Sequence, residues 1–429
     1  PRFAYVITLW GSSKAYTLGA LVLGHSLRAT KTRHALVCLH TADVPEGFLK
    51  LLSSIWDCRL VEHVTASKAL SWSEQDSRFE HVFTKLRGMG LVEFEKIIMM
   101  DIDMLVTANV DDLFHLPAPA AMSRGMHESY WAARHGDPLD GRRFFTGKQP
   151  GKSSSWGQGT GINAGVMLWQ PSDEVLADML QELEEPVHPA HVRGNGPEQD
   201  YLSRYWADAP WTNMGCEYNY QLHQMFNALH PDFVKISWRT KLSADPSRIK
   251  IIHYSGETAA KPWHRVLDKK LAHLWPDRGR DAEHAQLMAE EFLGYFLWIR
   301  RERACWDKHV QTGYPAFLYG FELSDEGAIV DTREQGKRLQ VELPEWATEG
   351  AMRTLRHSMA AWFDAFTALE RSIGIDVVAA LVEADPKTAD PGSRKADIGE
   401  PVELTWKASW FARPPEAAEP RPAAGQGRA

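Results

Sequence analysis

Short apolar runs alternate with helix-like segments through the first hundred residues, and this alternation limits the possible folds more than any other feature. The apolar runs are rich in β-branched and aromatic residues, which is typical of buried strands. The segments between them carry apolar residues at helical spacing. Such an alternation predicts a parallel sheet with helices on both faces. The predicted strands are residues 3–10, 34–40, 59–64 and 96–100, and the predicted helices are residues 11–30, 45–56 and 83–94.

The last of these strands runs into two aspartates, Asp101 and Asp103, separated by one residue. In open α/β sheets, ligands bind at the carboxyl ends of the strands. Two carboxylates at this spacing on an extended segment point the same way, and they repel each other unless a cation lies between them. Oxygen ligands suit Mg²⁺ and Mn²⁺, and such a metal can hold a diphosphate. The alternative is that Asp101 caps a turn while Asp103 is solvated.

Three later stretches place further polar groups at predicted strand ends. A strand over residues 248–257 carries His253, and an imidazole ligand favours Mn²⁺ over Mg²⁺. Gly256 lets a backbone approach a phosphate, and Lys261 is a point charge suited to a diphosphate leaving group. Asn163 lies among small residues in another predicted strand and suits the recognition of hydroxyl groups. A strand-end histidine is also a common structural feature, so these residues support the metal site only in combination.

The rest of the chain changes character beyond about residue 275, where long helices replace the α/β alternation. We therefore expect three parts, namely an α/β domain over residues 1–275, a mostly helical region over 276–385 and a Pro/Ala-rich extended or disordered tail over 386–429. The other elements predicted are a long loop over 128–161, a strand over 162–172, helices over 175–185 and 196–206, and C-terminal helices over 281–310 and 346–383 with an irregular section between them.

Composition excludes several classes of protein. The net charge of −8 leaves no basic footprint for nucleic acid. The sequence contains no run of 18 or more apolar residues, so it predicts no transmembrane helix. The four cysteines are scattered without C-x-x-C spacing, so they predict neither a disulfide framework nor a zinc site.

Several separated motifs, taken together, resemble a known family. They are "YVITLWGSSKAYTLGALVLGHSL", "FTKLRGMGLVEFEKIIMMDIDMLVTANVDDLF", "NAGVMLWQPS", "EQDYL" and "HYSGE" followed by "KPW". In this order, over about residues 3–265, they resemble a glycogenin-type member of glycosyltransferase family 8. The resemblance implies a GT-A fold, which is a nucleotide-binding α/β sheet. It also implies a UDP-sugar donor, Mn²⁺ as cofactor with Mg²⁺ as the alternative, and retention of the anomeric configuration.

The resemblance also assigns roles to individual residues. The metal ligands would be Asp101, Asp103 and His253. The residues that would contact the donor, from uridine through diphosphate to sugar, are Thr8, Leu9, Trp10, Tyr16, Lys85, Ile102, Asn163, Ala164, Gly165, Gly256 and Lys261. Around Trp10 this chain carries one residue more than glycogenin, and between Gly256 and Lys261 it carries two more.

The triplet Glu198-Gln199-Asp200 falls where the family carries an Asp-Gln pair that faces the anomeric carbon, so these residues, with Lys85, would be catalytic. Glu198 replaces the first aspartate of the pair and keeps its carboxylate. It would hold sugar hydroxyls or stabilise an oxocarbenium-like transition state. The structural alternative is a helix start with proline at its first position and acids in its first turn, which favours the helix dipole.

We therefore expect a retaining transferase that moves a hexose or related sugar from a UDP-sugar to a hydroxyl acceptor. Between the "YN" motif and His253 no tyrosine occurs beyond Tyr218 and Tyr220, so a separate glycan, lipid or small polyol is favoured over glycogenin-type self-glucosylation. The sugar, the compartment (cytosol or secretory lumen), and an oligomer or partner at the C-terminal helices stay open. One alternative is a haloacid-dehalogenase-like phosphatase with Asp101 as nucleophile, but that fold places its motif after the first strand. Another is a non-catalytic scaffold.

Overall fold

The protein is described here by a computed structural model covering residues 2–66, 81–125, 133–145, 160–185, 197–222, 245–255, 261–267, 321–323, 329–331, 339–340 and 345–385. Among these residues, no helix combines the length and the apolar character that crossing a membrane requires. Gly256 and the predicted helix over 281–310 lie outside the described residues.

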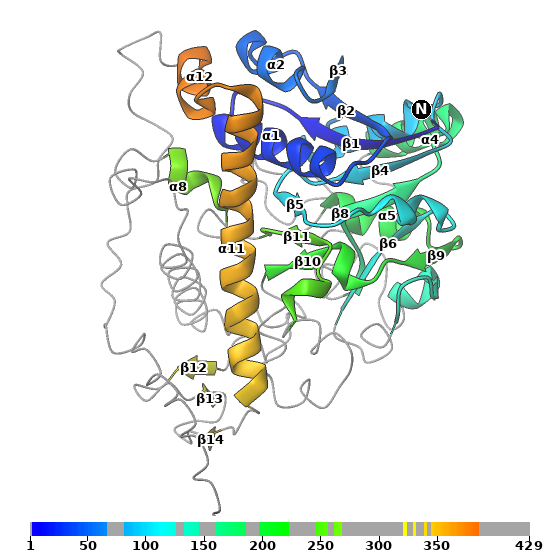
Figure 1. Cartoon of the computed structure of the whole chain (residues 1–429). Coiled ribbons are helices and arrows are strands. Elements are labelled where there is room, and N and C mark those ends of the chain that lie inside the picture. Colours follow the sequence, from blue (N-terminus) through cyan, green and yellow to red (C-terminus); the bar gives the residue numbers. More distant parts are fainter. Residues whose placement is uncertain are drawn as a thin grey trace, which may run out of the picture.

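The main sheet has eight strands in the order β3-β2-β1-β4-β8-β6-β9-β7 (Figure 1). β3, β2, β1 and β4 are parallel neighbours, β8 runs antiparallel to both β4 and β6, and β7 runs antiparallel to β9. The predicted class, a mixed and mainly parallel sheet flanked by helices, is confirmed. The strands are β1 Phe3–Leu9, β2 Ala35–His40, β3 Asp57–Leu60, β4 Lys96–Met100, β6 Ala120–Gly125, β7 Pro138–Asp140, β8 Thr160–Trp169 and β9 Pro210–Asn213.

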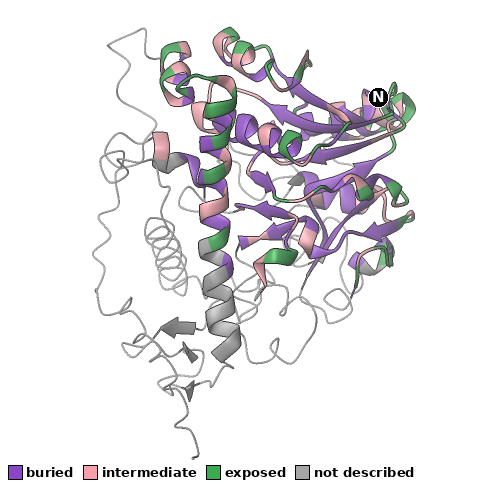
Figure 2. Ribbon diagram, viewed as in Figure 1, coloured by how far each residue is buried: buried purple, intermediate pink, exposed green. Residues whose placement is uncertain are grey.

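Helices cover both faces of this sheet because successive residues of a strand point to opposite sides. In β1, Tyr5 and Ile7 belong to a core shared with α1, α2, α11 and α12, while Ala4 and Val6 belong to a core shared with η3, α4 and α5. The central strands, such as β1 and β4, are accordingly buried on both faces, whereas the edge strands β3 and β7 are partly exposed (Figure 2). The helices are α1 Lys14–Ala29, α2 Glu46–Leu52, α4 Asp173–Glu184, α5 Pro197–Tyr205, α8 Trp263–Leu267, α11 Glu345–Ile373 and α12 Val377–Ala384.

The C-terminal helices α11 and α12 confirm the helical character predicted for residues 346–383. α11 crosses α1 and packs against it, and α12 packs against α1 and α2 (Figure 1). Trp362 and Phe366 of α11 are buried in the same core as the sheet, and the hydroxyl of Tyr254 donates a hydrogen bond to the carbonyl of Ser358 at 2.5 Å. The domain boundary at residue 275 stays a prediction.

Four sequence-based predictions need correction. The predicted helix over 83–94 is the shorter 3₁₀ helix η3 (Val82–Gly90), in which Gly88 and Gly90 weaken an α-helix. The described part of the predicted loop over 128–161 contains β7 and the 3₁₀ helix η5 (Gly141–Phe145). The predicted strand over 248–257 is reduced to β11, Ile251–His253. The section expected to be irregular contributes a small antiparallel sheet of β12 (Phe321–Leu323), β13 (Ile329–Asp331) and β14 (Leu339–Gln340).

A second small sheet positions the candidate site. Its strand order is β10-β11-β5, in which β10 is Tyr220–Gln221 and β5 is Met104–Val106. β5 begins directly after Asp103, and the register pairs His253 of β11 with Met104 of β5. The remaining 3₁₀ helices are η4 Asp111–His115, η7 Cys216–Tyr218 and η9 Pro246–Arg248.

Candidate functional site

The candidate site lies at one edge of the main sheet. β1, β4 and β6 run in the same direction and end at this edge, whereas β8 runs the opposite way and begins there. The first turn of α5 packs against β8, and the small sheet adds the end of β11. Residues that are far apart in the chain therefore lie close together where several strands end.

Asp101, Asp103 and His253 form a cluster in which one ligand atom from each lies within 4.8 Å of the others. His253 Nε2 lies 3.2 Å from Asp103 Oδ1 and 3.9 Å from Asp101 Oδ2. Backbone hydrogen bonds anchor both aspartates, because the Asp101 N–H donates to the Gly165 carbonyl and the Asp103 carbonyl accepts from the Tyr254 N–H, each at 2.8 Å. Two carboxylates and an imidazole nitrogen are a donor set that fits Mn²⁺.

A chain of buried asparagines orients the imidazole of His253. The Gly165 N–H and the Asn219 Nδ2 both donate to Asn163 Oδ1, at 2.9 and 2.7 Å. Asn219 therefore turns its Oδ1 toward His253 Nδ1, at 2.8 Å, and Nδ1 must carry the proton. Nε2 is therefore the ring nitrogen that faces the aspartates, and it is the atom that would bind a metal.

Asn219 was not among the predicted site residues, and Asn163 was predicted to bind the sugar. The Oδ1 of Asn163 is instead already engaged by Gly165 and Asn219. The only sequence signal for Asn219 is its place in the "YN" motif, between the apolar residues of η7 and β10. Its partners are 56 and 34 residues away, so their proximity could not be read from local patterns.

Two lysines flank the cluster. Lys85 Nζ lies 2.6 Å from Asp101 Oδ1 and 3.1 Å from Glu198 Oε1, and Lys261 Nζ bonds Asp103 Oδ2 and the Tyr254 carbonyl. Burial alone would lower the pKa of Lys85, but the two carboxylates outweigh it and raise that pKa. Burial alone would raise the pKa of Asp103, but Lys261 and His253 outweigh it and hold that pKa well below its usual range. Lys85 and Asp103 are therefore both charged at neutral pH.

The side chains of the Glu198-Gln199-Asp200 triplet take three different partners. Glu198 bonds Lys85, Gln199 Oε1 accepts from the Ala164 N–H at 3.3 Å, and Asp200 pairs with Arg124. Asp200 is fully buried. Glu198 is thus joined directly to the cluster, whereas Asp200 is turned into the protein against an arginine that the sequence analysis did not identify.

Gly165 has a steric role. A Cβ at this position would lie 2.7 Å from His253 Cε1 and 2.7 Å from Met104 Cε, closer than real Cβ contacts. The absent side chain therefore leaves room for the imidazole.

The residues predicted to lie near the uridine gather around the ends of β1 and α1. The Thr8 hydroxyl faces the sulfur of Met99 at 3.8 Å, Leu9 is part of the core, and Trp10 packs partly against the opposite core. Tyr16 is 44% exposed, and its ring lies 5.5 Å from that of Trp263. The Ile102 side chain is buried close to Gly19 of α1.

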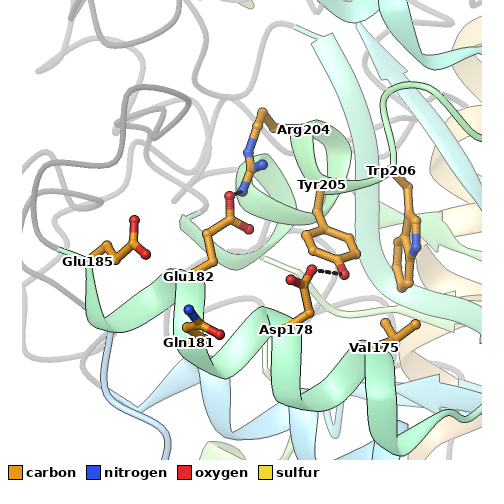
Figure 3. Close-up of a pocket in the computed structure, with 8 residues that line it drawn as sticks. All are labelled: Val175, Asp178, Gln181, Glu182, Glu185, Arg204, Tyr205 and Trp206. Carbon is orange, nitrogen blue, oxygen red and sulfur yellow. Dashed lines mark hydrogen bonds and ion pairs between the residues drawn. The ribbon is translucent and has the colours of Figure 1, made fainter.

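A second charged feature lies between α4 and α5, away from this edge. It is a hollow of about 540 Å³ (Figure 3). Glu182 pairs with Arg204, and the Tyr205 hydroxyl donates to Asp178 at 2.6 Å. The lining residues, which we call the α4–α5 hollow, are Val175, Asp178, Gln181, Glu182, Glu185, Arg204, Tyr205 and Trp206.

Comparisons with known proteins agree on one family. The sequence model of glycosyl transferase family 8 matches residues 7–266, which is more than half of the chain. Uncharacterized protein R707 of Acanthamoeba polyphaga mimivirus is 32% identical over 63% of this chain and 85% of its own length. Glycogenin-1 of Homo sapiens is 26% identical over 67% of this chain and 68% of its own length. UDP-glucuronate:xylan alpha-glucuronosyltransferase 2 of Arabidopsis thaliana is 26% identical over 61% of this chain, but the match spans only 36% of that enzyme.

Proposed function

The chain belongs to glycosyl transferase family 8, and on that premise we propose that it transfers a sugar from a UDP-sugar to a hydroxyl group with retention of configuration. The family makes it a glycosyltransferase with the GT-A fold. The UDP-sugar donor, the divalent metal and the retention of configuration are parts of our proposal.

The observation that carries the proposal is the convergence of Asp101, Asp103 and His253 at the carboxyl edge of the sheet. The two carboxylates repel each other, and a divalent cation bound between them and the imidazole nitrogen would remove that repulsion. Mn²⁺ is the proposed cofactor because the set mixes oxygen and nitrogen ligands. When bound there, the ion would supply positive charge beside the diphosphate of the donor.

The chain's own residues would supply the rest of the chemistry. Lys261, which bonds Asp103, is proposed to compensate the charge that develops on departing UDP. Lys85 is proposed to hold the carboxylates of Asp101 and Glu198 at the distance that separates leaving group from sugar. Glu198 would then lie at the anomeric carbon and stabilise its developing positive charge.

Two mechanisms can retain the configuration of the anomeric carbon. The acceptor hydroxyl can attack on the face from which UDP departs, or a carboxylate can form a short-lived adduct with the sugar. Of the two carboxylates in the triplet, Glu198 is the better candidate for an adduct, since Asp200 is fully buried against Arg124.

The proposed acceptor is a separate glycan, lipid or small polyol, because residues 221–252 contain no tyrosine for self-glucosylation of the glycogenin kind. The printed names of the relatives do not narrow this, since one acts on xylan from UDP-glucuronate and another is a glycogenin. Because the chain belongs to glycosyl transferase family 8, a haloacid-dehalogenase-like phosphatase is not supported. A non-catalytic scaffold is disfavoured by the complete set of metal-type ligands with its supporting asparagines.

A donor screen tests the proposal. The purified full chain is incubated with common UDP-sugars with and without Mn²⁺, and released UDP is measured together with UDP binding by calorimetry. We expect metal-dependent UDP release from one donor class and metal-dependent UDP binding that the Asp103→Ala variant loses. If no common UDP-sugar gives metal-dependent release, and Asp103→Ala binds UDP as the parent does, the proposal is wrong. Hydrolysis of a generic aryl phosphate would favour the phosphatase.

A further inference from the structure

Two cysteines from different strands lie side by side in the main sheet. β2 and β3 are parallel neighbours, and their register pairs Cys38 directly with Cys58. Both side chains lie on the same face of the sheet, because Cys38 belongs to the core shared with α1 and α2 and Cys58 packs against that core. Neither residue forms a disulfide. The pairing of these cysteines is a result of the fold, since nothing in their local sequence connects them.

The spacing of the two residues suits a covalent bond between their sulfur atoms. Neighbouring strands lie about 4.8 Å apart, and disulfides usually join Cα atoms that are roughly 4.4–6.8 Å apart. β3 is an edge strand, and β2 is its one neighbour among the described strands of the sheet (Figure 1). Because no described strand holds the other side of β3, this strand can adjust when the two sulfurs approach each other.

The two thiols differ in their access to solvent. Cys38 is fully buried, whereas Cys58 is partly exposed. The neighbouring Cys38 thiol lowers the pKa of the Cys58 thiol, and Cys58, together with burial, raises the pKa of the Cys38 thiol. The thiolate is the nucleophile in thiol–disulfide exchange. Cys58 is therefore the thiol that reacts first with an external oxidant, and Cys38 is placed to react second.

We propose that Cys38 and Cys58 form a reversible redox site, which a small-molecule disulfide such as oxidised glutathione converts into a disulfide bond between β2 and β3. The bond closes a loop that contains α2 and joins the edge strand to the sheet covalently. This inference does not depend on the proposed function. The rival explanation is that both thiols only pack against the core.

The exchange takes place in two steps. The thiolate of Cys58 attacks one sulfur of oxidised glutathione, so a mixed disulfide forms, the glutathione S–S bond breaks, and one glutathione leaves and takes up a proton. The thiol of Cys38 then loses its proton and attacks the sulfur of Cys58, and the second glutathione leaves and takes up a proton. In total, two protein thiols are oxidised to one disulfide, and one oxidised glutathione is reduced to two glutathione thiols.

The test uses the full chain under native conditions. The protein is incubated with mixtures of reduced and oxidised glutathione, quenched with acid, unfolded and alkylated, and its peptides are mapped by mass spectrometry. We expect Cys38 and Cys58 to lose alkylation together and to appear in one disulfide-linked peptide pair that dithiothreitol releases. In the reduced native protein, iodoacetamide should label Cys58 at least about tenfold faster than Cys38.

Single variants test the order of the two steps. Cys38→Ser should stop at the mixed disulfide of Cys58 with glutathione, and Cys58→Ser should leave the buried Cys38 reduced. Cys216→Ser is the matched control, since that cysteine is also buried, and it should form the bond between β2 and β3 as the parent does. The measurement on the parent chain needs no variant, so it decides the question even if a variant does not fold.

The inference is overturned if no ratio of oxidised to reduced glutathione joins Cys38 to Cys58 in the native chain. It is also overturned if the bond appears only after urea has unfolded the protein, or if Cys38 reacts with glutathione equally well in the parent and in Cys58→Ser. None of these results affects the proposed function, because metal-dependent binding and release of UDP are measured separately.

Discussion

Two charged regions of this molecule look alike in composition but differ in arrangement. The strand-end cluster comprises Lys85, Asp101, Asp103, Glu198, His253 and Lys261, and the α4–α5 hollow contains Asp178, Glu182, Glu185 and Arg204 (Figure 3). In the hollow, Glu182 and Asp178 of α4 are each bonded by side chains of the facing helix α5. In the cluster, two carboxylates converge on one imidazole nitrogen and on each other.

The charged side chains of the hollow join two neighbouring helices, α4 and α5. Arg204 pairs with Glu182 and lies 5.0 Å from the ring centre of Tyr201, whose hydroxyl also bonds Glu182. This arrangement fastens α5 to α4, although Arg204 Nε and Nη2 make no hydrogen bond within the described part of the chain. The strand-end cluster draws its members from separate elements and holds like charges together, which indicates a cation or a charged substrate. The geometry of the charges thus distinguishes a site from a structural contact better than the presence of a cavity does.

The largest effect on transfer activity is expected from a substitution in the strand-end cluster, compared with one in the α4–α5 hollow. Asp103→Ala removes a metal-type ligand and the partner of Lys261, so we expect transfer activity to fall by roughly 10³-fold with loss of metal-dependent UDP binding. Asp178→Ala in the hollow is the matched control and should stay within about twofold of the parent. Activity is measured as metal-dependent UDP release. An equal loss in both variants would contradict the distinction.

Lys85→Met should have the next largest effect. It leaves Asp101 and Glu198 without their shared cation, so kcat should fall by roughly 10²-fold and the free energy of unfolding by about 3 kcal/mol. Steady-state kinetics and urea unfolding measure the two quantities. Lys250→Met removes the more exposed pair with Asp112 and should change stability by less than about 1 kcal/mol. Similar unfolding free energies for both variants would mean that the buried ion pairs of Lys85 stabilise the fold no more than the exposed pair of Lys250 does.

Asn219→Ala tests the support of His253. Without the acceptor for Nδ1–H the imidazole loses its fixed tautomer, so the affinity for Mn²⁺ should fall about 10- to 100-fold. Calorimetric titration of metal into the variant in the presence of UDP measures this change. Asn109→Ala, which removes an exposed asparagine beside Asp111, is the control. Unchanged metal affinity in the Asn219 variant would show that the asparagine chain serves packing only.

The smallest effect on function is expected in the hollow. Arg204→Gln removes the partner of Glu182 and should lower the free energy of unfolding by about 1–2 kcal/mol, while UDP release stays within about twofold. Tyr205→Phe, which loses an exposed bond to Asp178, should change stability by less still. Urea unfolding and the UDP-release assay are run side by side. A large loss of activity at constant stability in either variant would make the hollow a second functional site.

Much of the α/β architecture could be predicted because it depends on local periodicity. β1, β2 and β4 and helices α1, α2, α4 and α5 match the predicted segments closely, since each has a strand or helix pattern of its own. The short strands β5 and β10 were not predicted, and β11 is only the central part of the predicted strand over 248–257. β5 pairs with β11 across more than 140 residues of chain, β10 pairs with the other side of β11, and pairing of this kind is not visible in a local stretch.

The amino-acid sequence by itself determined that this chain forms an α/β sheet whose strand-end aspartates, with a distant histidine, are candidates for a metal centre. It could do so because strands, helices and acidic motifs are short-range patterns. Only the tertiary structure decided that Asn163 and Asn219 orient His253 and that Asp200 turns inward to pair with Arg124. These roles depend on hydrogen bonds between residues 34 to 76 positions apart, and burial turns such contacts into strong constraints.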